Sequence, residues 1–238
     1  MSLAVRKSIA GRRRVLLLLG SAVLATQARA QPPPGRENMP ACVLTPQQTE
    51  GPYFVDERLR RSDIRSDPAD GSVKPGVPLG LTLRVAAING ARCSALQGAV
   101  VDIWHCDASG IYSDVADPGF DTTGKKFLRG YQLTDANGIV RFLTIYPGWY
   151  PGRTVHIHFK VRAKDASGRE RELTSQLYFD DALTARVHAR PPYARRDRQA
   201  QKNETDGIFR HGGQQLVLAV AEEGAGYAAA FDIGLKIG

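Results

Sequence analysis

Two histidines that stand two positions apart are the residues of this sequence best placed to bind a metal ion. His156 and His158 follow a tyrosine-rich turn in the stretch YPGWYPGRTVHIHFKV (146–161). In a β-strand successive side chains point to opposite faces, so the two imidazoles share one face while Val155 and Ile157 share the core-facing one. The histidines are about 7 Å apart along a strand, and metal–nitrogen bonds are about 2 Å long, so both rings can reach one ion. Two exposed histidines on a sheet surface would show the same spacing.

Tyrosines near the histidines narrow the kind of metal. Tyr150 and Arg153 precede the histidine pair, and Tyr112 stands in a second stretch, WHCDASGIYSD. No carboxylate lies close in sequence, as a two-histidine, one-carboxylate iron(II) site would suggest. A phenol with an ordinary pKa of about 10 binds as phenolate at neutral pH only to a strong Lewis acid, which favours ferric iron. Taken singly, Tyr112 also fits an aromatic packed at a strand end, and His105 fits a strand-end histidine that is hydrogen-bonded nearby.

Strands must position these side chains, because apolar and polar residues alternate through most of the chain after residue 78. The alternation is clear in LGLTLRVAAI (79–88), where Leu79, Leu81 and Leu83 share a face. Residues 182–212 are basic and broken by proline, which predicts a long loop or a frayed helix. Short strands with turns between them predict an all-β protein, an antiparallel β-sandwich with long loops and little helix. The further predicted strands cover 98–106, 126–134, 139–146, 153–163, 171–181, 214–221 and 227–235.

The first thirty residues have the composition of an export signal. A basic start containing RRR (12–14) precedes the apolar run VLLLLGSAVLA, and ARA (28–30) has the small-residue pattern of a cleavage site. The arginine run favours twin-arginine export over an ordinary secretory signal. We therefore expect a periplasmic or secreted protein. The apolar run is too short to span a bilayer comfortably. We expect a Pro-rich leader over 31–44 and one domain over 45–238.

Net charge argues against nucleic acid as a partner. The chain has 32 Lys and Arg against 24 Asp and Glu, a formal charge of +8, but six basic residues and no acidic ones fall within residues 1–30. Removing them leaves 26 against 24, about +2, so residues 31–238 have no bulk electrostatic attraction to a polyanion.

Cysteine usage agrees with an oxidising compartment. The three cysteines are Cys42, Cys93 and Cys106, which predict one disulfide with one cysteine outside it. The sequence leaves the pairing open. No CxxC spacing is present, which argues against a thiolate metal site.

Five segments in a fixed order carry a family resemblance. They are TEGPYF, VVDIWHCDASGIYSD, LRGYQLTDANGIVRFLTIYPGWYP, RxxHIHF and LTSQLYF, between Thr49 and Phe179. Together they resemble the intradiol ring-cleavage dioxygenases, the protocatechuate and catechol dioxygenase group, in which a β-sandwich holds non-haem Fe(III) through two tyrosines and two histidines. Only five residues separate Tyr150 from His156, fewer than members commonly carry, which leaves the ring substituents of the substrate open.

The resemblance implies four ligands of Fe(III), from the GxYS turn, the PGxYP turn and the HxH strand. Of these, the PGxYP tyrosine would be the ligand that is displaced and takes a proton from the substrate. Tyr131 and Tyr146 have no match as ligands and are expected to be structural. The four implied ligands are Tyr112, Tyr150, His156 and His158.

Other positions acquire roles from the same resemblance. Arg153 would stabilise negative charge that develops on the substrate ring. Gln176, in the SQLYF strand, would orient that arginine or a substrate oxygen. Gly51 and Tyr53, in the TEGPYF segment, would border the substrate pocket.

The resemblance implies a dioxygenase that cleaves a catechol-type ring with O2, adds both oxygen atoms and gives a cis,cis-muconate-type product, a step in the catabolism of aromatic compounds. Its partners would be the aromatic diol and O2, with no nucleic acid, no membrane span in the mature chain, and a homo-oligomeric assembly left open. A non-catalytic prealbumin-like β-sandwich binding module would share the strand pattern without needing the tyrosine, arginine, histidine and glutamine set. A zinc or copper hydrolase would need a third histidine or a carboxylate at suitable spacing.

Overall fold

The computed structural model describes residues 42–193 and 201–238, which belong to one compact unit. The predicted export signal over 1–30 and residues 31–41 of the predicted leader lie outside the described residues. Among the residues described, no helix is long and apolar enough to cross a membrane.

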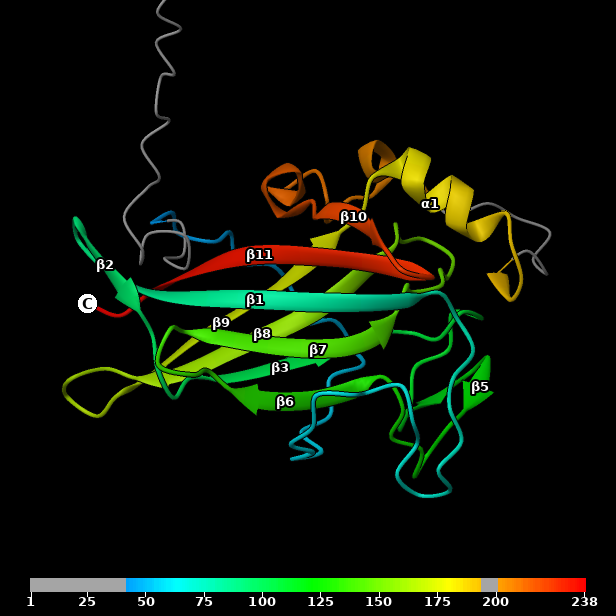
Figure 1. The fold of residues 1–238 in the computed structure, drawn as a ribbon, viewed down its shortest axis with the longest axis horizontal. Coiled ribbons are helices and arrows are strands. Elements are labelled where there is room, and N and C mark those ends of the chain that lie inside the picture. The colour runs from blue at the N-terminus through cyan, green and yellow to red at the C-terminus, as the bar shows by residue number, and fades with distance from the viewer. Residues whose placement is uncertain (1–41, 194–200) are drawn as a thin grey trace, which may run out of the picture. The chain divides into compact units, whose positions relative to one another are not determined.

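The described chain forms two β-sheets packed face to face, which confirms the predicted all-β sandwich (Figure 1). One sheet has the strand order β10-β11-β1-β2, with β7 also pairing with β1, and the other has the order β6-β3-β8-β9. A short pair, β4-β5, lies at the same end of the sandwich as the helix α1. The strands are β1 (Pro78–Asn89), β2 (Arg92–Ala95), β3 (Val100–Trp104), β4 (Ala116–Asp117), β5 (Phe120–Asp121), β6 (Arg129–Leu133), β7 (Ile139–Ile145), β8 (His156–Lys164), β9 (Glu170–Tyr178), β10 (Ala219–Glu223) and β11 (Gly226–Lys236); the helices are α1 (Asp181–His188) and the 3-10 turns η2 (Asn203–Thr205) and η3 (Gly213–Leu216).

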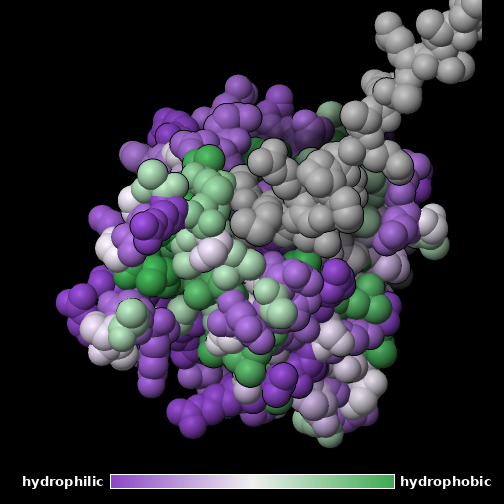
Figure 2. Space-filling view, turned by 60° about the vertical axis from the view of Figure 1, so that its left-hand side comes forward, coloured by the Kyte–Doolittle hydropathy of each residue, from purple (hydrophilic) through white to green (hydrophobic). Residues whose placement is uncertain are grey.

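The core lies between the two sheets, where the alternation of the sequence places it. Leu81 and Leu83 of β1 are buried on one side, and Ile157 and Phe159 of β8 are buried on the other. Every second residue of these strands contributes to the same apolar cluster, because side chains alternate across a pleated strand. Hydrophilic and hydrophobic residues are mixed over the side of the molecule that Figure 2 shows.

The outer face of the second sheet is also covered, which the sequence did not indicate. The segment before β1 crosses β9, where the backbone amide of Gln48 donates to the Thr174 carbonyl over 2.9 Å. Lys160, on the outer face of β8, forms an ion pair with Glu50 of this segment. Residues that point away from the sandwich core are therefore still shielded from water.

Local details differ from the sequence-based expectations. The predicted strand 214–221 begins as the turn η3, because Gly212 adopts a φ of +90° and starts a tight turn, so β10 begins only at Ala219. Within 182–212, α1 forms behind the N-cap Asp180, whose carboxylate accepts from the Leu183 amide. β1 and β11 pair in parallel. They are far apart in sequence and are not joined by a hairpin, so the antiparallel direction is not required.

A disulfide closes the end of the sandwich opposite the helix. It joins Cys42 to Cys93 of β2, across 51 residues of sequence. This is the pairing that the sequence left open. Cys106 is buried in a separate aromatic cluster with Trp104 and Tyr112.

Candidate metal and active site

Four side chains converge where β8 begins. Nε2 of His156 lies 3.0 Å from Nε2 of His158, 3.2 Å from Oη of Tyr150 and 3.4 Å from Oη of Tyr112. The Trp104–His158 pair ends the β3–β8 ladder. The loop after β3, which carries Tyr112, and the loop before β8, which carries Tyr150, therefore emerge at the same end of the sheet. The structure thus brings together all four ligands that the resemblance implied.

Hydrogen bonding fixes the protonation of one imidazole. Nδ1 of His156 lies 2.7 Å from the carbonyl oxygen of Thr154 and donates to it, so Nε2 presents its lone pair to the cluster. Nδ1 of His158 is buried and has no hydrogen-bond partner among the described residues. Its ring instead stacks on Trp104, with centroids 4.9 Å apart and planes within 7°. Both rings are therefore held by contacts that leave Nε2 facing the tyrosines.

Burial sets the charge of the site. Burial lowers the pKa of His156 to about 3 and lowers the pKa of His158 well below its ordinary value, so both rings are neutral at neutral pH. Burial also raises the pKa of Tyr150 to about 12 and that of Tyr112 well above 10. Two neutral imidazoles and two phenols packed together form a set of donors that only a strongly charged cation would convert to phenolates.

These residues fit a ferric ion. Two donor atoms that each lie about 2 Å from one metal ion are about 3 Å apart, which matches the distances around Nε2 of His156. A lone pair of His156 directed at a second imidazole nitrogen and two phenol oxygens would gain from a cation among them. No group of three or more His, Cys, Asp or Glu side chains within the described ranges could hold a metal. The imidazoles therefore have tyrosines, rather than further histidines or carboxylates, as their partners.

A close backbone contact sets the separation of the two tyrosines. The amide of Gly148 donates to the Asp107 carbonyl over 3.2 Å, and a Cβ at Gly148 would lie 2.3 Å from that oxygen and 2.7 Å from the carbonyl of Ala108. Asp107 and Ala108 begin the turn that leads to Tyr112, and Gly148 lies two residues before Tyr150. Glycine is therefore required here so that the two tyrosine-bearing loops can touch.

Gly51 and Tyr53, predicted to border the pocket, both lie against residues of the four-donor cluster. A Cβ at Gly51, where φ is +71°, would lie 3.3 Å from Cε1 of His158. The Tyr53 ring stacks on the Tyr112 ring with centroids 4.5 Å apart, and its edge meets Tyr150 at 6.2 Å. The Tyr53 hydroxyl donates to the carboxylate of Asp117 in β4 over 2.8 Å. The β4-β5 pair is therefore attached to the site through one aromatic ring.

Arg153 and Gln176 contact each other. The Arg153 guanidinium donates to Oε1 of Gln176 through one nitrogen and to Oδ2 of Asp206 through Nε, the latter over 2.9 Å. The Gln176 amide donates in turn to the carbonyl of Thr49, which ties β9 to the segment that carries Gly51. Arg153 is thus held on two sides before any substrate is present.

Two charged residues at the site escaped the sequence analysis. Arg129 is buried and donates to the Tyr53 carbonyl over 2.9 Å and to the Ser113 hydroxyl over 2.8 Å, which links the Tyr53 and Tyr112 segments. Burial lowers the pKa of Arg129 to about 10, so it remains charged at neutral pH. The second residue is Asp206, fully buried behind Arg153. The 126–134 stretch KFLRGYQLT holds other polar residues as well, so its pattern did not single out Arg129.

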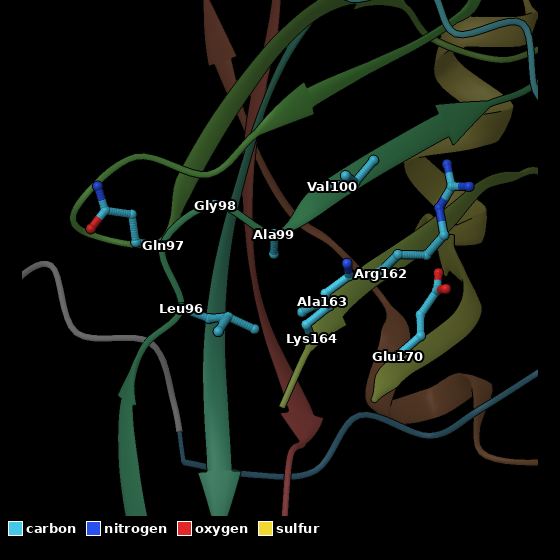
Figure 3. Close-up of a pocket in the computed structure, with 9 residues that line it drawn as sticks. All are labelled: Leu96, Gln97, Gly98, Ala99, Val100, Arg162, Ala163, Lys164 and Glu170. Atoms are coloured by element: carbon cyan, nitrogen blue, oxygen red, sulfur yellow. The ribbon is translucent and has the colours of Figure 1, made fainter. Parts of the chain in front are cut away.

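A separate surface cavity lies away from these residues. It has a volume of about 420 Å³ and is lined by residues from Leu96 to Val100 together with Arg162 and Glu170 (Figure 3). Val100 pairs with Arg162 at the far end of the ladder from the Trp104–His158 pair, about 13 Å along the strand. This cavity is therefore distinct from the tyrosine–histidine site.

The fold and the site define an all-β protein with a buried centre of two tyrosines and two histidines. A family model described as Dioxygenase matches residues 49–197. The chain is 32% identical over 185 residues to the protocatechuate 3,4-dioxygenase beta chain of Burkholderia cepacia, covering 71% of each chain. It is 27% identical over 190 residues to a chlorocatechol 1,2-dioxygenase of Pseudomonas putida, covering 72% of this chain and 65% of that one.

Solved structures agree with this relationship. An intradiol ring-cleavage dioxygenase from Tetranychus urticae matches with a TM-score of 0.70 and 32% identity, over 82% of this chain and 95% of that one. The dioxygenase domain of a carbohydrate-binding fusion protein from Streptomyces sp. SirexAA-E matches with a TM-score of 0.59 and 33% identity, over 82% and 100%. The chain belongs to the intradiol ring-cleavage dioxygenase family, a family of oxidoreductases.

Proposed function

We propose that this protein is a non-haem Fe(III) intradiol dioxygenase that opens the ring of a catechol-type substrate with O2. Both oxygen atoms would enter the product, a cis,cis-muconate-type diacid. The observation that carries the proposal is the convergence of two phenol oxygens and a second imidazole nitrogen within 3.4 Å of Nε2 of His156. A binding module has no need to bury such a set, because buried polar groups cost stability and their clustering is typical of functional sites.

Tyr112, Tyr150, His156 and His158 would hold the iron. When bound, Fe(III) would keep the two tyrosines ionised and accept both oxygens of the diol, which activates the ring toward O2. Three of the four ligands are buried, whereas Tyr150 is only partly buried. Tyr150 therefore has the room to swing away when the diol arrives, and its phenolate oxygen can take one of the two diol protons.

The neighbouring residues would orient the substrate and its developing charge. Arg153 carries a guanidinium already fixed by Gln176 and Asp206, so it can stabilise negative charge on the ring without reorganising. Tyr53 stacks on Tyr112 and so forms an aromatic wall beside the ligands.

We further propose that the protein acts outside the cytoplasm, in the periplasm or as a secreted protein. The basic and apolar residues 1–30 support export. The disulfide between Cys42 and Cys93 gives independent support, because disulfides persist in oxidising compartments.

The test combines iron content, visible spectrum and turnover. We expect the purified protein, loaded with Fe(III), to bind about one iron per chain and to show a visible tyrosinate-to-iron band that shifts when catechol is added. Tyr150→Phe should shift or remove that band and lower kcat by a factor of 10²–10⁴, the range for loss of a proton-transfer group. Tyr131→Phe, in β6 and outside the four-donor cluster, is the matched control and should change neither the band nor kcat. A protein that stays colourless and iron-free after loading would refute the proposal, and unchanged Tyr150→Phe kinetics would refute the ligand assignment.

A further inference from the structure

Asp206 is the most fully coordinated carboxylate next to the site. Its side chain is completely buried, although it follows the turn η2 in a segment that is largely polar. Oδ2 accepts from Nε of Arg153 over 2.9 Å and from the backbone amide of Thr154 over 2.8 Å. Oδ1 accepts from the amides of Ile208 and Phe209 over 2.7 and 2.9 Å. Four N–H groups thus share one carboxylate.

Both contacts of Oδ2 lead toward the cluster of four donors. Arg153 also donates to Gln176, so its guanidinium is clamped between a carboxylate and an amide oxygen. Thr154, whose amide is held by Asp206, presents its carbonyl to Nδ1 of His156 over 2.7 Å. A single carboxylate therefore fixes the charged group beside the substrate and the backbone that orients one imidazole.

The contacts of Oδ1 anchor the carboxylate itself. Gln48 holds the Ile208–Phe209 turn, because its side-chain amide donates to the Ile208 carbonyl over 3.2 Å. The Tyr178 hydroxyl in turn donates to Oε1 of Gln48 over 2.7 Å. Gln48 belongs to the segment that crosses the second sheet. Asp206 is thus built into a rigid frame of hydrogen bonds, which is what precise placement of a neighbouring cation requires.

We propose that Asp206 is a positioning residue of the active site, which holds the Arg153 guanidinium and the Thr154 carbonyl in the arrangement that ring cleavage needs. The proposal rests on the proposed function, since it concerns the role of Arg153 in that reaction. Asp206 does not touch the four donor atoms and acts through Arg153 and Thr154. Its charge matters because it accepts from a cation and three amides at once.

Asp206→Asn tests whether the negative charge of the Asp206 carboxylate is needed, because asparagine has almost the same shape. The amide keeps one oxygen but turns an NH2 group toward two N–H donors, whichever way it is oriented. If the NH2 group faces Arg153 and Thr154, both lose their acceptor. We expect kcat to fall by about 10- to 100-fold, since misplacement of a catalytic group by about 1 Å costs up to about 10² in rate, while KM changes less than about threefold.

Asp165→Asn is a matched control. Asp165 lies in the hairpin between β8 and β9, and its Oδ1 accepts from the amides of Ser167 and Arg169 over 2.8 and 3.0 Å. Its Oδ2 pairs with Arg171 over 2.9 Å. The same substitution there removes a carboxylate that also caps a turn and pairs with an arginine, at the end of β8 remote from the histidines. We expect Asp165→Asn to lower the melting temperature and to leave kcat unchanged.

A double-mutant cycle separates positioning from general stability. In an Arg153→Gln background, Asp206→Asn should lower kcat by less than about threefold, because the group through which Asp206 mainly acts is already gone. Iron content and the visible band of Asp206→Asn should stay close to those of the wild type, because all four ligands remain. If Asp206→Asn fails to fold, Arg153→Gln/Asp206→Asn, in which no arginine is left facing the lost carboxylate, should fold and bind iron.

The outcomes decide the proposal. Equal losses of kcat in Asp206→Asn and Asp165→Asn, or a full effect of Asp206→Asn in the Arg153→Gln background, would overturn it. Failure of the double variant to fold would also overturn it, since Asp206 would then be a purely structural residue. An inactive, iron-free wild-type protein would refute the proposed function instead, so the two failures are distinguishable.

Discussion

Gly148→Ala should separate the two tyrosine-bearing loops. The new Cβ would lie 2.3 Å from the Asp107 carbonyl oxygen, against 3.4 Å for ordinary contact, so the loops must move apart by about 1.1 Å. Neither neighbour can yield easily, because both atoms in the clash belong to backbone. Since Tyr112 follows one side of this contact and Tyr150 the other, the movement should lengthen the distances of 3.4 and 3.2 Å that their hydroxyls make to Nε2 of His156.

The expected cost has a stability part and a site part. Overpacking of this size destabilises by about 1–3 kcal/mol, which lowers the melting temperature by about 2–4 °C per kcal/mol in a chain of this length. Displacement of one of the two proposed tyrosine ligands by about 1 Å should weaken the visible band and lower kcat by up to about 100-fold. We would measure iron content, the visible spectrum and kcat with catechol, together with thermal unfolding.

Gly207→Ala is the control for this prediction. A Cβ at Gly207 meets nothing within 4 Å, and its φ lies outside the left-handed region. We expect a neutral or slightly stabilising effect there, because alanine restricts the unfolded chain. Wild-type melting temperature, spectrum and kcat in Gly148→Ala would show that the glycine contact does not set the separation of the tyrosines.

Two further changes have measurable outcomes. Asp117→Asn removes a carboxylate that accepts a hydrogen bond from Tyr53 at the edge of the site. Loss of this negative charge should raise kcat/KM for a carboxylated catechol relative to plain catechol by about two- to fivefold, the size expected for one solvent-screened charge interaction. An unchanged ratio would count against a role of β4 in substrate choice. Burial lowers the pKa of His105 from 6.5 to about 4. Between these pH values His105 takes up a proton in the unfolded state but stays neutral in the folded state. The free energy of unfolding therefore falls by about 3 kcal/mol as the pH is lowered through this range. Urea unfolding of the iron-loaded protein across that range should show this loss, and His105→Gln should reduce it. The same dependence of unfolding free energy on pH in both proteins would show that His105 is not its source.

The sequence predicted the strands correctly where apolar and polar residues alternate, because side chains along a strand point to opposite faces in turn. Strand alternation put Ile157 and Phe159 in the core and the two histidines on the opposite face, and the structure has this arrangement. The alternation could not show that this opposite face is covered. His156 and His158 are 2% and 1% exposed because a segment about a hundred residues earlier in the chain crosses the sheet. Burial of the outer face depends on tertiary contacts, which no local pattern encodes.

The short strands and the buried Arg129 escaped prediction for related reasons. β4 and β5 have two residues each, too few for a periodic signal, yet they bring Asp117 to the hydroxyl of Tyr53. A lone arginine in a strand is usually solvent-exposed, so no local pattern indicates that Arg129 lies behind the Tyr53 and Tyr112 segments.

The distribution of charge explains why these unpredicted residues matter. Two arginines lie next to the site, the buried Arg129 and the half-buried Arg153. Each donates to oxygen atoms of other segments: Arg129 to Ser113 and the Tyr53 carbonyl, Arg153 to Asp206 and Gln176. A buried cation is tolerated only when several acceptors surround it, so each arginine forces distant segments to keep one relative position. The four donor atoms come from three separate segments, around Tyr112, around Tyr150 and in β8. A ligand set assembled from such segments stays within bonding distance of one ion only if they cannot move independently. The two arginines and their acceptors therefore supply, through electrostatics, the rigidity that loops lack on their own.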